Sequence, residues 1–246
     1  MQSYLANPAA KIDVLQPGEE KAPVIIIDGA LKNFKELIEN ACEIKDESAS
    51  GLGRYGFASG RALYPGVCKP TPQAYQQFIF REIMPIVADV YKIAQHRLHH
   101  LNSDFSIVNA AQSDLHFRQR IPHCDGLNPA EIAMIHFFCE EKFGGTSLYR
   151  HKKTGYEFIS KARQKSYFET LEQEANSVEQ LDYAGYIHQD SSQFEKYFTC
   201  PAKMDRLFIY PCPVLHSGDI QDDYKVASHP KESRLTVTNF LYNASD

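Results

Sequence analysis

The chain has 246 residues and a formal net charge of −5, with 43% hydrophobic and 23% charged residues. This mildly acidic composition gives no reason to expect a nucleic acid or an anionic membrane as a partner. No apolar run approaches the roughly 18 residues of a membrane-spanning helix, and the N-terminus lacks the features of a secretion signal. Six cysteines without a C-x-x-C pair are typical of reduced thiols. We therefore expect a cytoplasmic protein whose single domain covers 1–246.

The first half of the chain predicts one strand and two helical segments. Residues 23–28 form a β-branched run that ends at a glycine, which indicates a buried strand. Apolar residues then recur at helical spacing over 31–41. A stretch rich in glycine and serine at 46–66 predicts a loop, and Thr71 is the predicted cap of a long helix. Pro85 lies inside that helix, so we expect a kink or two abutting helices there.

The second half consists of short runs rich in β-branched and aromatic residues, separated by glycine turns. The predicted strands are 105–109, 113–117, 132–139, 146–150, 156–159, 206–210 and 235–242. This order favours an α+β, mostly β fold, in which an antiparallel sandwich or barrel carries the N-terminal helices (about 30–100) on one face. Polar residues at about 160–203 indicate an insertion, either a lid over the site or a decoration.

A candidate metal site lies in the segment 121–126. If this segment is extended, His123 and Asp125 leave the same face, because side chains at i and i+2 do so in a strand. Two histidines and one carboxylate form the arrangement that leaves open positions on iron(II). His216, which follows the predicted strand 206–210, is a good candidate for the second histidine. Alone, His-x-Asp is a weak signal, because 10 histidines and 31 acidic residues produce this spacing by chance.

Two further features strengthen the candidate site. Arg234 begins the last predicted strand, where it shares a face with Thr236. An arginine at this position is costly to bury unless it meets an anion, and its planar fork suits a carboxylate. Lys225 is a rival for this role, although its loop setting favours Arg234. In addition, a Gly144-Gly145 turn joins two predicted strands of the sheet that carries His-x-Asp.

Together these residues resemble the iron(II)- and 2-oxoglutarate-dependent oxygenase superfamily, and most closely its prolyl-hydroxylase-like branch. The chain is also similar to a bacterial family that shares the Gly-Gly-Thr-Ser-Leu-Tyr-Arg-His type of segment. The resemblance implies a double-stranded β-helix, which is a jelly-roll or cupin-like barrel, and a dioxygenase with Fe(II) as metal and 2-oxoglutarate as cosubstrate. It makes His123, Asp125 and His216 the iron ligands. It also makes Arg234 the partner of the distal carboxylate of 2-oxoglutarate, with Thr236 as a hydroxyl donor.

One departure concerns the strand that often supplies a tyrosine to 2-oxoglutarate in this superfamily, because residues 134–138 contain none. His136, Tyr149 and Gln112 are candidates to replace it. Two alternatives also stay open: a zinc-dependent hydrolytic enzyme on the same ligands, and a non-catalytic jelly-roll binding protein. The favoured function is a hydroxylase of a small molecule, an amino acid or a peptide. The sequence chooses neither the substrate nor the oligomeric state.

Overall fold

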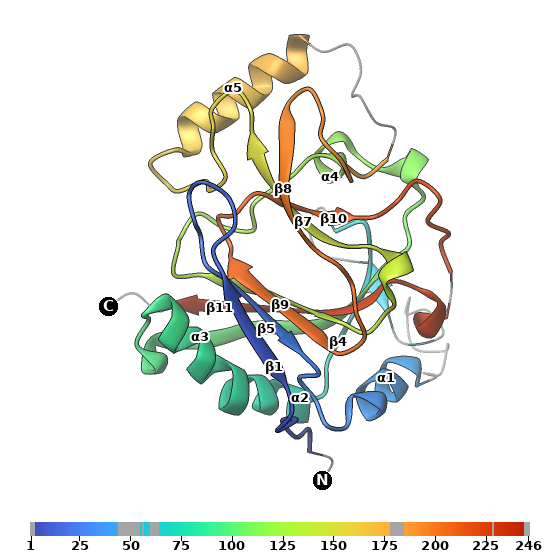
Figure 1. Ribbon diagram of the computed structural model, residues 1–246. Coiled ribbons are helices and arrows are strands. Elements are labelled where there is room, and N and C mark those ends of the chain that lie inside the picture. Colours follow the sequence, from blue (N-terminus) through green and yellow to red (C-terminus); the bar gives the residue numbers. More distant parts are fainter. Residues whose placement is uncertain are drawn as a thin grey trace.

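The computed structural model describes residues 3–43, 55, 57–59, 64–177, 185–227 and 229–243. Two antiparallel sheets form its framework (Figure 1). The larger sheet has eight strands in the order β1-β2-β9-β6-β11-β5-β4-β3, and the smaller has three in the order β10-β7-β8. Among the described residues, no helix combines the length and the apolar character needed to cross a membrane.

The strands of the larger sheet are β1 (Lys11–Leu15), β2 (Val24–Asp28), β3 (Ala58–Ser59), β4 (Gly66–Pro70), β5 (Leu98–Val108), β6 (Ile132–Phe137), β9 (Arg206–Pro211) and β11 (Leu235–Asn243). The smaller sheet contains β7 (Gly145–His151), β8 (Phe194–Cys200) and β10 (His216–Asp219). The α-helices are α1 (Phe34–Cys42), α2 (Gln73–Phe78), α3 (Met84–Tyr91), α4 (Phe117–Arg120) and α5 (Gln164–Ser177). Shorter helical turns are η1 (Ile79–Ile83), η2 (Gln95–Arg97), η3 (Gln112–Asp114), η4 (Glu141–Phe143) and η5 (Pro230–Glu232).

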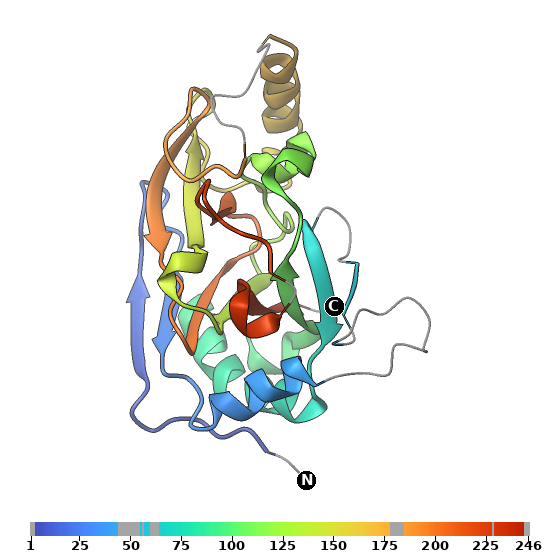
Figure 2. The same cartoon turned by 90° about the vertical axis from the view of Figure 1, so that its right-hand side faces the viewer.

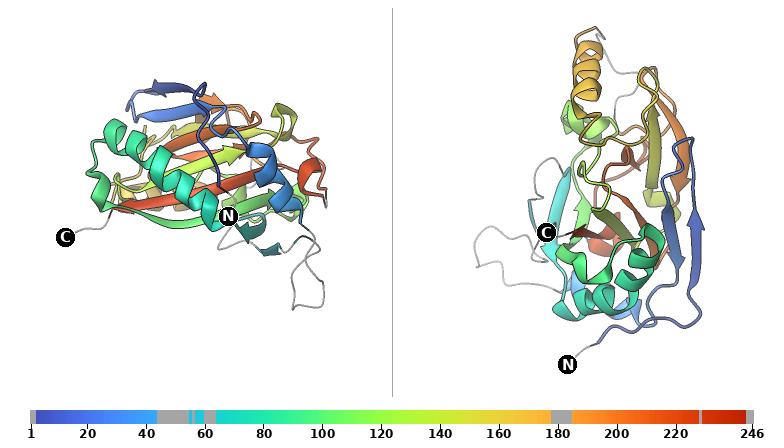
Figure 3. Two further views of the ribbon diagram at one scale, coloured as in Figure 1. Left: turned by 90° about the horizontal axis from the view of Figure 1, so that it is seen from below. Right: turned by 90° about the vertical axis from the view of Figure 1, so that its left-hand side faces the viewer.

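Two hydrophobic cores lie on opposite faces of the larger sheet. Helices α1 to α3 cover one face, where Leu235 and Val237 of β11 are fully buried (Figure 3). The second core lies between the two sheets and joins Phe137 and Phe208 of the larger sheet to Leu148 of the smaller one. Figure 2 shows the β1–β2 hairpin and β4 on opposite sides of the molecule, as expected for the two ends of the larger sheet. The expectation of a mostly β chain with antiparallel sheets is therefore confirmed.

The predicted elements of the first half are largely confirmed, as β2, α1 and the pair α2–α3. The π-turn η1 separates α2 from α3, and Pro85 occupies the first turn of α3. Proline has no N–H to donate to the preceding turn, which explains the break. The predicted cap at Thr71 was wrong, because the N-cap position is Pro72 and the Thr71 hydroxyl lies 2.7 Å from Ser103 Oγ. Most of the predicted loop 46–66 lies outside the described residues, and β3 falls within it.

In the second half, β5, β6, β7, β9 and β11 confirm five predicted strands. The predicted strand 113–117 was wrong, because these residues form η3 and begin α4. His116 starts a capping box: its Nδ1 accepts the Arg118 N–H at 3.2 Å, and Gln119 Oε1 accepts the His116 N–H at 2.7 Å. Residues 156–159 contribute only isolated bridges and no strand. Part of the predicted insertion is the strand β8, which pairs with β7.

Candidate metal centre

Three side chains from two distant segments meet beside the smaller sheet. The ligand atoms of His123, Asp125 and His216 all lie within 4.8 Å of one another. Nε2 of His123 lies 3.8 Å from Oδ1 of Asp125, and Nε2 of His216 lies 3.4 Å from Oδ2 of the same carboxylate. No other group of three or more His, Cys, Asp or Glu residues in the described part of the chain has this spacing. The structure therefore brings together the three residues that the sequence singled out.

Backbone hydrogen bonds hold these residues in place. The His123 N–H donates to the His216 carbonyl at 2.9 Å, and the His216 N–H donates back at 2.8 Å. This antiparallel bridge places the two imidazole rings 4.4 Å apart. The Asp125 N–H donates to the Cys212 carbonyl at 2.8 Å. The segment 121–126 thus belongs to no strand, yet His123 and Asp125 face the same point as expected.

Each of the two imidazoles can present an unprotonated ring nitrogen to a metal ion. Nδ1 of His216 lies 3.0 Å from the Val214 carbonyl, which can only accept, so Nδ1 carries the proton and Nε2 is free for a metal. Partial desolvation of the ring and the neighbouring His216 lower the pKa of His123, which favours the neutral form that can bind a metal. The His216 side chain is 6% exposed and that of His123 is 52% exposed. The group is therefore open to solvent on the His123 side.

Arg234 is a buried cation with only neutral acceptors around it. Its Nε and Nη2 donate to the carbonyls of Gly144 (3.2 Å) and Gly145 (2.7 Å), and its guanidinium lies 5.5 Å from the centre of the Phe137 ring. The side chain is 5% exposed, and no described carboxylate forms an ion pair with it. A guanidinium in this position is costly to bury without an anion. The two acceptor carbonyls belong to the Gly-Gly turn. Glycine is needed there because a Cβ at Gly145 would lie 2.1 Å from the Cys200 carbonyl oxygen.

Three tyrosines surround Arg234, and we call them together with it the Arg234 cluster: Tyr64, Tyr186, Tyr224 and Arg234. The tyrosines pack in one small core, and the Arg234 N–H lies 3.4 Å from the Tyr224 hydroxyl. Tyr224 itself donates to Val108. The hydroxyls of Tyr64 and Tyr186 are buried and have no hydrogen-bond partner among the described residues. Burial raises the pKa of both hydroxyls and the charge of Arg234 partly offsets this, so both carry their proton.

The register of the smaller sheet relates the Arg234 cluster to the three candidate ligands. His216 is paired with Leu148, and Gly218 with Thr146, whose hydroxyl lies 3.4 Å from Nη2 of Arg234. The two levels are therefore two residues apart on β7, which corresponds to roughly 7 Å. Tyr210 lies between these two levels. Its ring is 4.8 Å from that of His216, and the charges of both Asp125 and Arg234 affect the pKa of its hydroxyl.

The remaining predicted pocket residues have different surroundings. Thr236 is buried on the same face of β11 as Arg234, and its hydroxyl donates to the Ser106 carbonyl at 3.4 Å. Gln112 donates from Nε2 to the Gln221 carbonyl at 2.7 Å and packs against Gly185. Lys225, the rival of Arg234, is exposed. An exposed ammonium needs no bound anion, whereas the buried guanidinium of Arg234 does.

The structure does not bring His136 and Tyr149 to the candidate site. His136 lies on the helix-covered side of β6, where Nε2 meets Asp205 at 2.9 Å and Nδ1 meets the Tyr75 hydroxyl at 3.0 Å. Tyr149 lies on the outer face of the smaller sheet and donates to the Ile187 carbonyl at 3.0 Å. Successive residues of a strand alternate between its two faces, so His136 and Tyr149 point to the face of their strand that is turned away from the candidate site.

The fold and the site define a class of protein: two antiparallel sheets with a candidate His–Asp–His metal centre and a buried arginine beside it. The chain shares its fold with the non-heme alpha ketoglutarate dependent carbocyclase SnoK from nogalamycin biosynthesis, with 12% identity, a TM-score of 0.53, and coverage of 92% of this chain and 81% of that chain. The chain belongs to the family of unknown function DUF6445, which matches residues 8–241.

Two further solved structures are similar at lower scores. HygX from Streptomyces hygroscopicus, with nickel and 2-oxoglutarate bound, has 9% identity, a TM-score of 0.48, and coverage of 92% of this chain and 84% of that chain. An N-substituted L-amino acid dioxygenase from Burkholderia ambifaria AMMD has 9% identity, a TM-score of 0.44, and coverage of 100% and 97%. No curated protein matches the sequence.

Proposed function

We propose that the chain is an iron(II)- and 2-oxoglutarate-dependent dioxygenase of the hydroxylase type, built on a jelly-roll barrel. One observation carries this proposal: an open His–Asp–His group lies about two strand residues from a buried arginine that has no carboxylate partner. A metal alone would explain the three ligands but not the arginine. A dicarboxylate that reaches from the metal to Arg234 explains both.

The three candidate ligands suit iron(II). Two neutral imidazole nitrogens and one carboxylate oxygen form a facial set that leaves positions open for other ligands. The hydrogen bond from His216 Nδ1 to Val214 orients the ring and holds the tautomer that a metal requires. Zinc also accepts this set. A hydrolytic zinc enzyme, however, gives no reason to bury Arg234.

The Arg234 cluster suits the far carboxylate of 2-oxoglutarate. Arg234 supplies the charge, and the unpartnered hydroxyls of Tyr64 and Tyr186 supply two neutral donors. Thr236 stays a candidate third hydroxyl on the same face. A carboxylate accepts about four hydrogen bonds, so it can satisfy the arginine and the orphaned hydroxyls together. A five-carbon diacid spans the interval of roughly 7 Å between the two levels of β7.

In this mechanism the residues of the chain bind the metal and the oxoacid and orient them. Iron(II) and 2-oxoglutarate, when bound, would supply the oxidation: the oxoacid loses CO₂ and takes one oxygen atom of O₂ to become succinate, and the other oxygen atom is inserted into a C–H bond of the substrate. His123, Asp125 and His216 would hold the metal, and Arg234 would fix the direction of the oxoacid. The buried rings of Phe137 and Tyr210 exclude water between these two ends. The substrate, a small molecule, an amino acid or a peptide, would approach from the exposed His123 side.

Anaerobic titration tests the proposal directly. Metal-free protein with iron(II) and 2-oxoglutarate is expected to develop the weak visible charge-transfer band of a chelated 2-oxoacid. The band should vanish in His123→Ala and persist in the control His99→Ala, whose exposed ring stacks on Tyr242 far along β5. A folded, iron-binding wild type without a band would contradict the proposal. Tight zinc binding with no iron binding would favour the hydrolytic alternative.

The two orphaned hydroxyls provide a second prediction. Tyr64→Phe and Tyr186→Phe should each weaken 2-oxoglutarate binding roughly 10- to 100-fold, because a hydrogen bond to a charged group contributes about 1.5–3 kcal/mol. Tyr4→Phe is the matched control, since its hydroxyl is also buried without a partner but lies in the core on the helix-covered side of the larger sheet. The measurement is the 2-oxoglutarate concentration at half-maximal charge-transfer absorbance. Unchanged affinity in both variants would remove these tyrosines from the carboxylate site.

A further inference from the structure

The described parts of the inserted segment, which we define as residues 160–177 and 185–193, pack behind the candidate metal centre. Its helix α5 contributes Tyr167 and Leu171 to a core on the outer face of the smaller sheet. The same core receives Leu215, the residue before the candidate ligand His216. In Figure 1, α5 lies at the top of the molecule, at the end opposite to helices α1 to α3.

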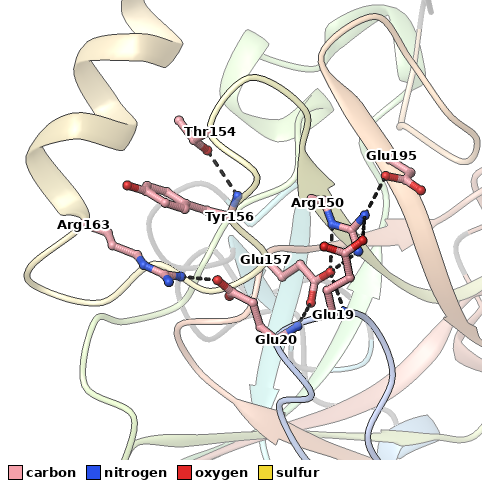
Figure 4. Close-up of polar contacts among 8 residues, drawn as sticks. All are labelled: Glu19, Glu20, Arg150, Thr154, Tyr156, Glu157, Arg163 and Glu195. Carbon is pink, nitrogen blue, oxygen red and sulfur yellow. Dashed lines mark hydrogen bonds and ion pairs between the residues drawn. The ribbon is translucent and has the colours of Figure 1, made fainter.

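The base of the inserted segment is firmly attached. Arg163, the residue before α5, forms an ion pair with Glu20, and Figure 4 shows this pair beside a second cluster around Arg150. There Glu157 accepts from Arg150 at 2.5 and 2.9 Å and from the backbone N–H of Glu19 at 3.0 Å. These contacts join the start of α5 to β7 and to the connection between β1 and β2. The helix therefore begins from a fixed point.

A buried pair holds α5 along its length. Nε2 of His151, at the end of β7, lies 2.7 Å from Oε2 of Glu174, and its Nδ1 lies 2.9 Å from the Thr154 hydroxyl. The His151 side chain is completely buried, and the Tyr167 ring meets it edge-on at 5.3 Å. An interaction between buried polar groups is directional. It fixes the helix against the smaller sheet more specifically than apolar packing alone.

The returning end of the inserted segment contacts the residues that precede His123 and the Arg234 cluster. The Ile187 N–H donates to the Arg120 carbonyl at 3.3 Å, and the Ile187 carbonyl accepts from the Tyr149 hydroxyl. The preceding residue, Tyr186, belongs to the Arg234 cluster. Three consecutive residues, 185–187, thus touch the segment before His123 and the proposed carboxylate site.

The segment that carries His123 and Asp125 depends on this packing. We call residues 117–127 the ligand segment; it contains one short helix and one isolated bridge, and no strand. Four of its side chains pack into the core behind the smaller sheet: Phe117, Ile121, Cys124 and Leu127. Cys124, which lies between the two candidate ligands, packs in the same core as Tyr167 and Leu171 of α5.

We infer that the inserted segment is a clasp that positions the ligand segment from behind, with Leu171 and Tyr167 of α5 as positioning residues for His123 and Asp125. This inference rests on the proposed metal centre. Neither α5 residue belongs to the candidate ligand group. Both act through Cys124 and its neighbours, so their loss changes the geometry of the ligands rather than their number.

Cobalt(II) binding to the full chain tests this inference without any need for activity. Leu171→Ala should weaken cobalt(II) binding roughly 10- to 100-fold, the range for residues that orient metal ligands, and should alter the visible absorption of the bound ion. Leu171→Met should restore both. The control Ile38→Ala removes a buried side chain from α1 on the helix-covered side, and should lower the melting temperature without changing cobalt(II) affinity.

Each outcome separates the inference from the proposed function. A wild type that binds no cobalt(II) overturns the metal centre and the inference together. A wild type that binds cobalt(II) with Leu171→Ala unchanged overturns the clasp alone. Equal losses of affinity in Leu171→Ala and Ile38→Ala would also overturn it, because they indicate general destabilisation. Should Leu171→Ala fail to fold, the milder Leu171→Val is measured against the same control.

Discussion

Arg234→Met is expected to abolish most of the stabilisation that 2-oxoglutarate gives to the metal-loaded protein. At 100 times its dissociation constant a ligand stabilises a protein by about 2.7 kcal/mol. Loss of a two-pronged charged contact weakens binding roughly 100-fold, which leaves about 0.4 kcal/mol at the same concentration. Methionine fills a similar volume next to Phe137 and removes a buried charge without an ionic partner, so the unliganded protein should stay folded. The measurement is the melting temperature with and without 2-oxoglutarate.

Lys225→Met is the matched control for this prediction. Lys225 was the rival candidate and is exposed, so its loss should leave the stabilisation by 2-oxoglutarate unchanged. Arg234→Lys should fall between wild type and Arg234→Met, because it keeps the charge but loses the planar fork. If 2-oxoglutarate raised the melting temperature of Arg234→Met normally but not that of Lys225→Met, the carboxylate-binding role would belong to Lys225.

Asp205→Ala is expected to lower the free energy of unfolding by about 3–5 kcal/mol, the range for a broken buried charged network. The Asp205 carboxylate accepts from the Leu31 N–H at 3.0 and 3.1 Å and lies 2.9 Å from Nε2 of His136. His136 continues to the Tyr75 hydroxyl, which links β6 to α2. Alanine leaves these buried groups without a partner, and each costs about 1–3 kcal/mol. Urea unfolding at constant m-value measures the change.

A control for Asp205→Ala is Asp13→Ala on the edge strand β1. Asp13 pairs with Lys11 at 2.8 Å, but both side chains are exposed, so its replacement should change stability very little. A loss below about 1 kcal/mol in Asp205→Ala would contradict the assignment of the Tyr75–His136–Asp205 chain as a structural network. Charge-transfer measurements on any folded fraction should be normal, because the network lies on the face of β6 away from the candidate metal centre.

The candidate site was more predictable from the sequence than its surroundings. His123 and Asp125 are two residues apart, which is local information, and the burial cost of Arg234 follows from its position in a strand. The tyrosines Tyr64, Tyr186 and Tyr210 were missed because they are isolated in the sequence and meet Arg234 or His216 only through the fold. Tyr210 had one usable signal, since it lies six residues before His216 on a strand whose alternate residues face inward.

The strands that could be predicted are those with a buried, β-branched or aromatic sequence. A strand that forms only by pairing with a neighbouring strand could not be predicted. The strand β10 reads His216-Ser217-Gly218-Asp219, which has no β-branched or aromatic residue, and is formed by pairing with β7. The strand 113–117 was predicted as one of the short runs of β-branched and aromatic residues. The capping box at His116 decides otherwise, because its side-chain hydrogen bonds favour a helical turn. A pattern of apolar residues does not predict local polar contacts of this kind.

The reciprocal main-chain bridge between His123 and His216 has a consequence for how the protein would handle its metal. In zinc fingers the ligands gather only when the ion arrives, so metal binding and folding are one event. Here two hydrogen bonds of 2.8 and 2.9 Å already hold the two histidines side by side. Such a protein can release its metal under scarcity and be reloaded without refolding. Its activity would then follow the free metal in its surroundings within the time of ion exchange, with no need for new synthesis.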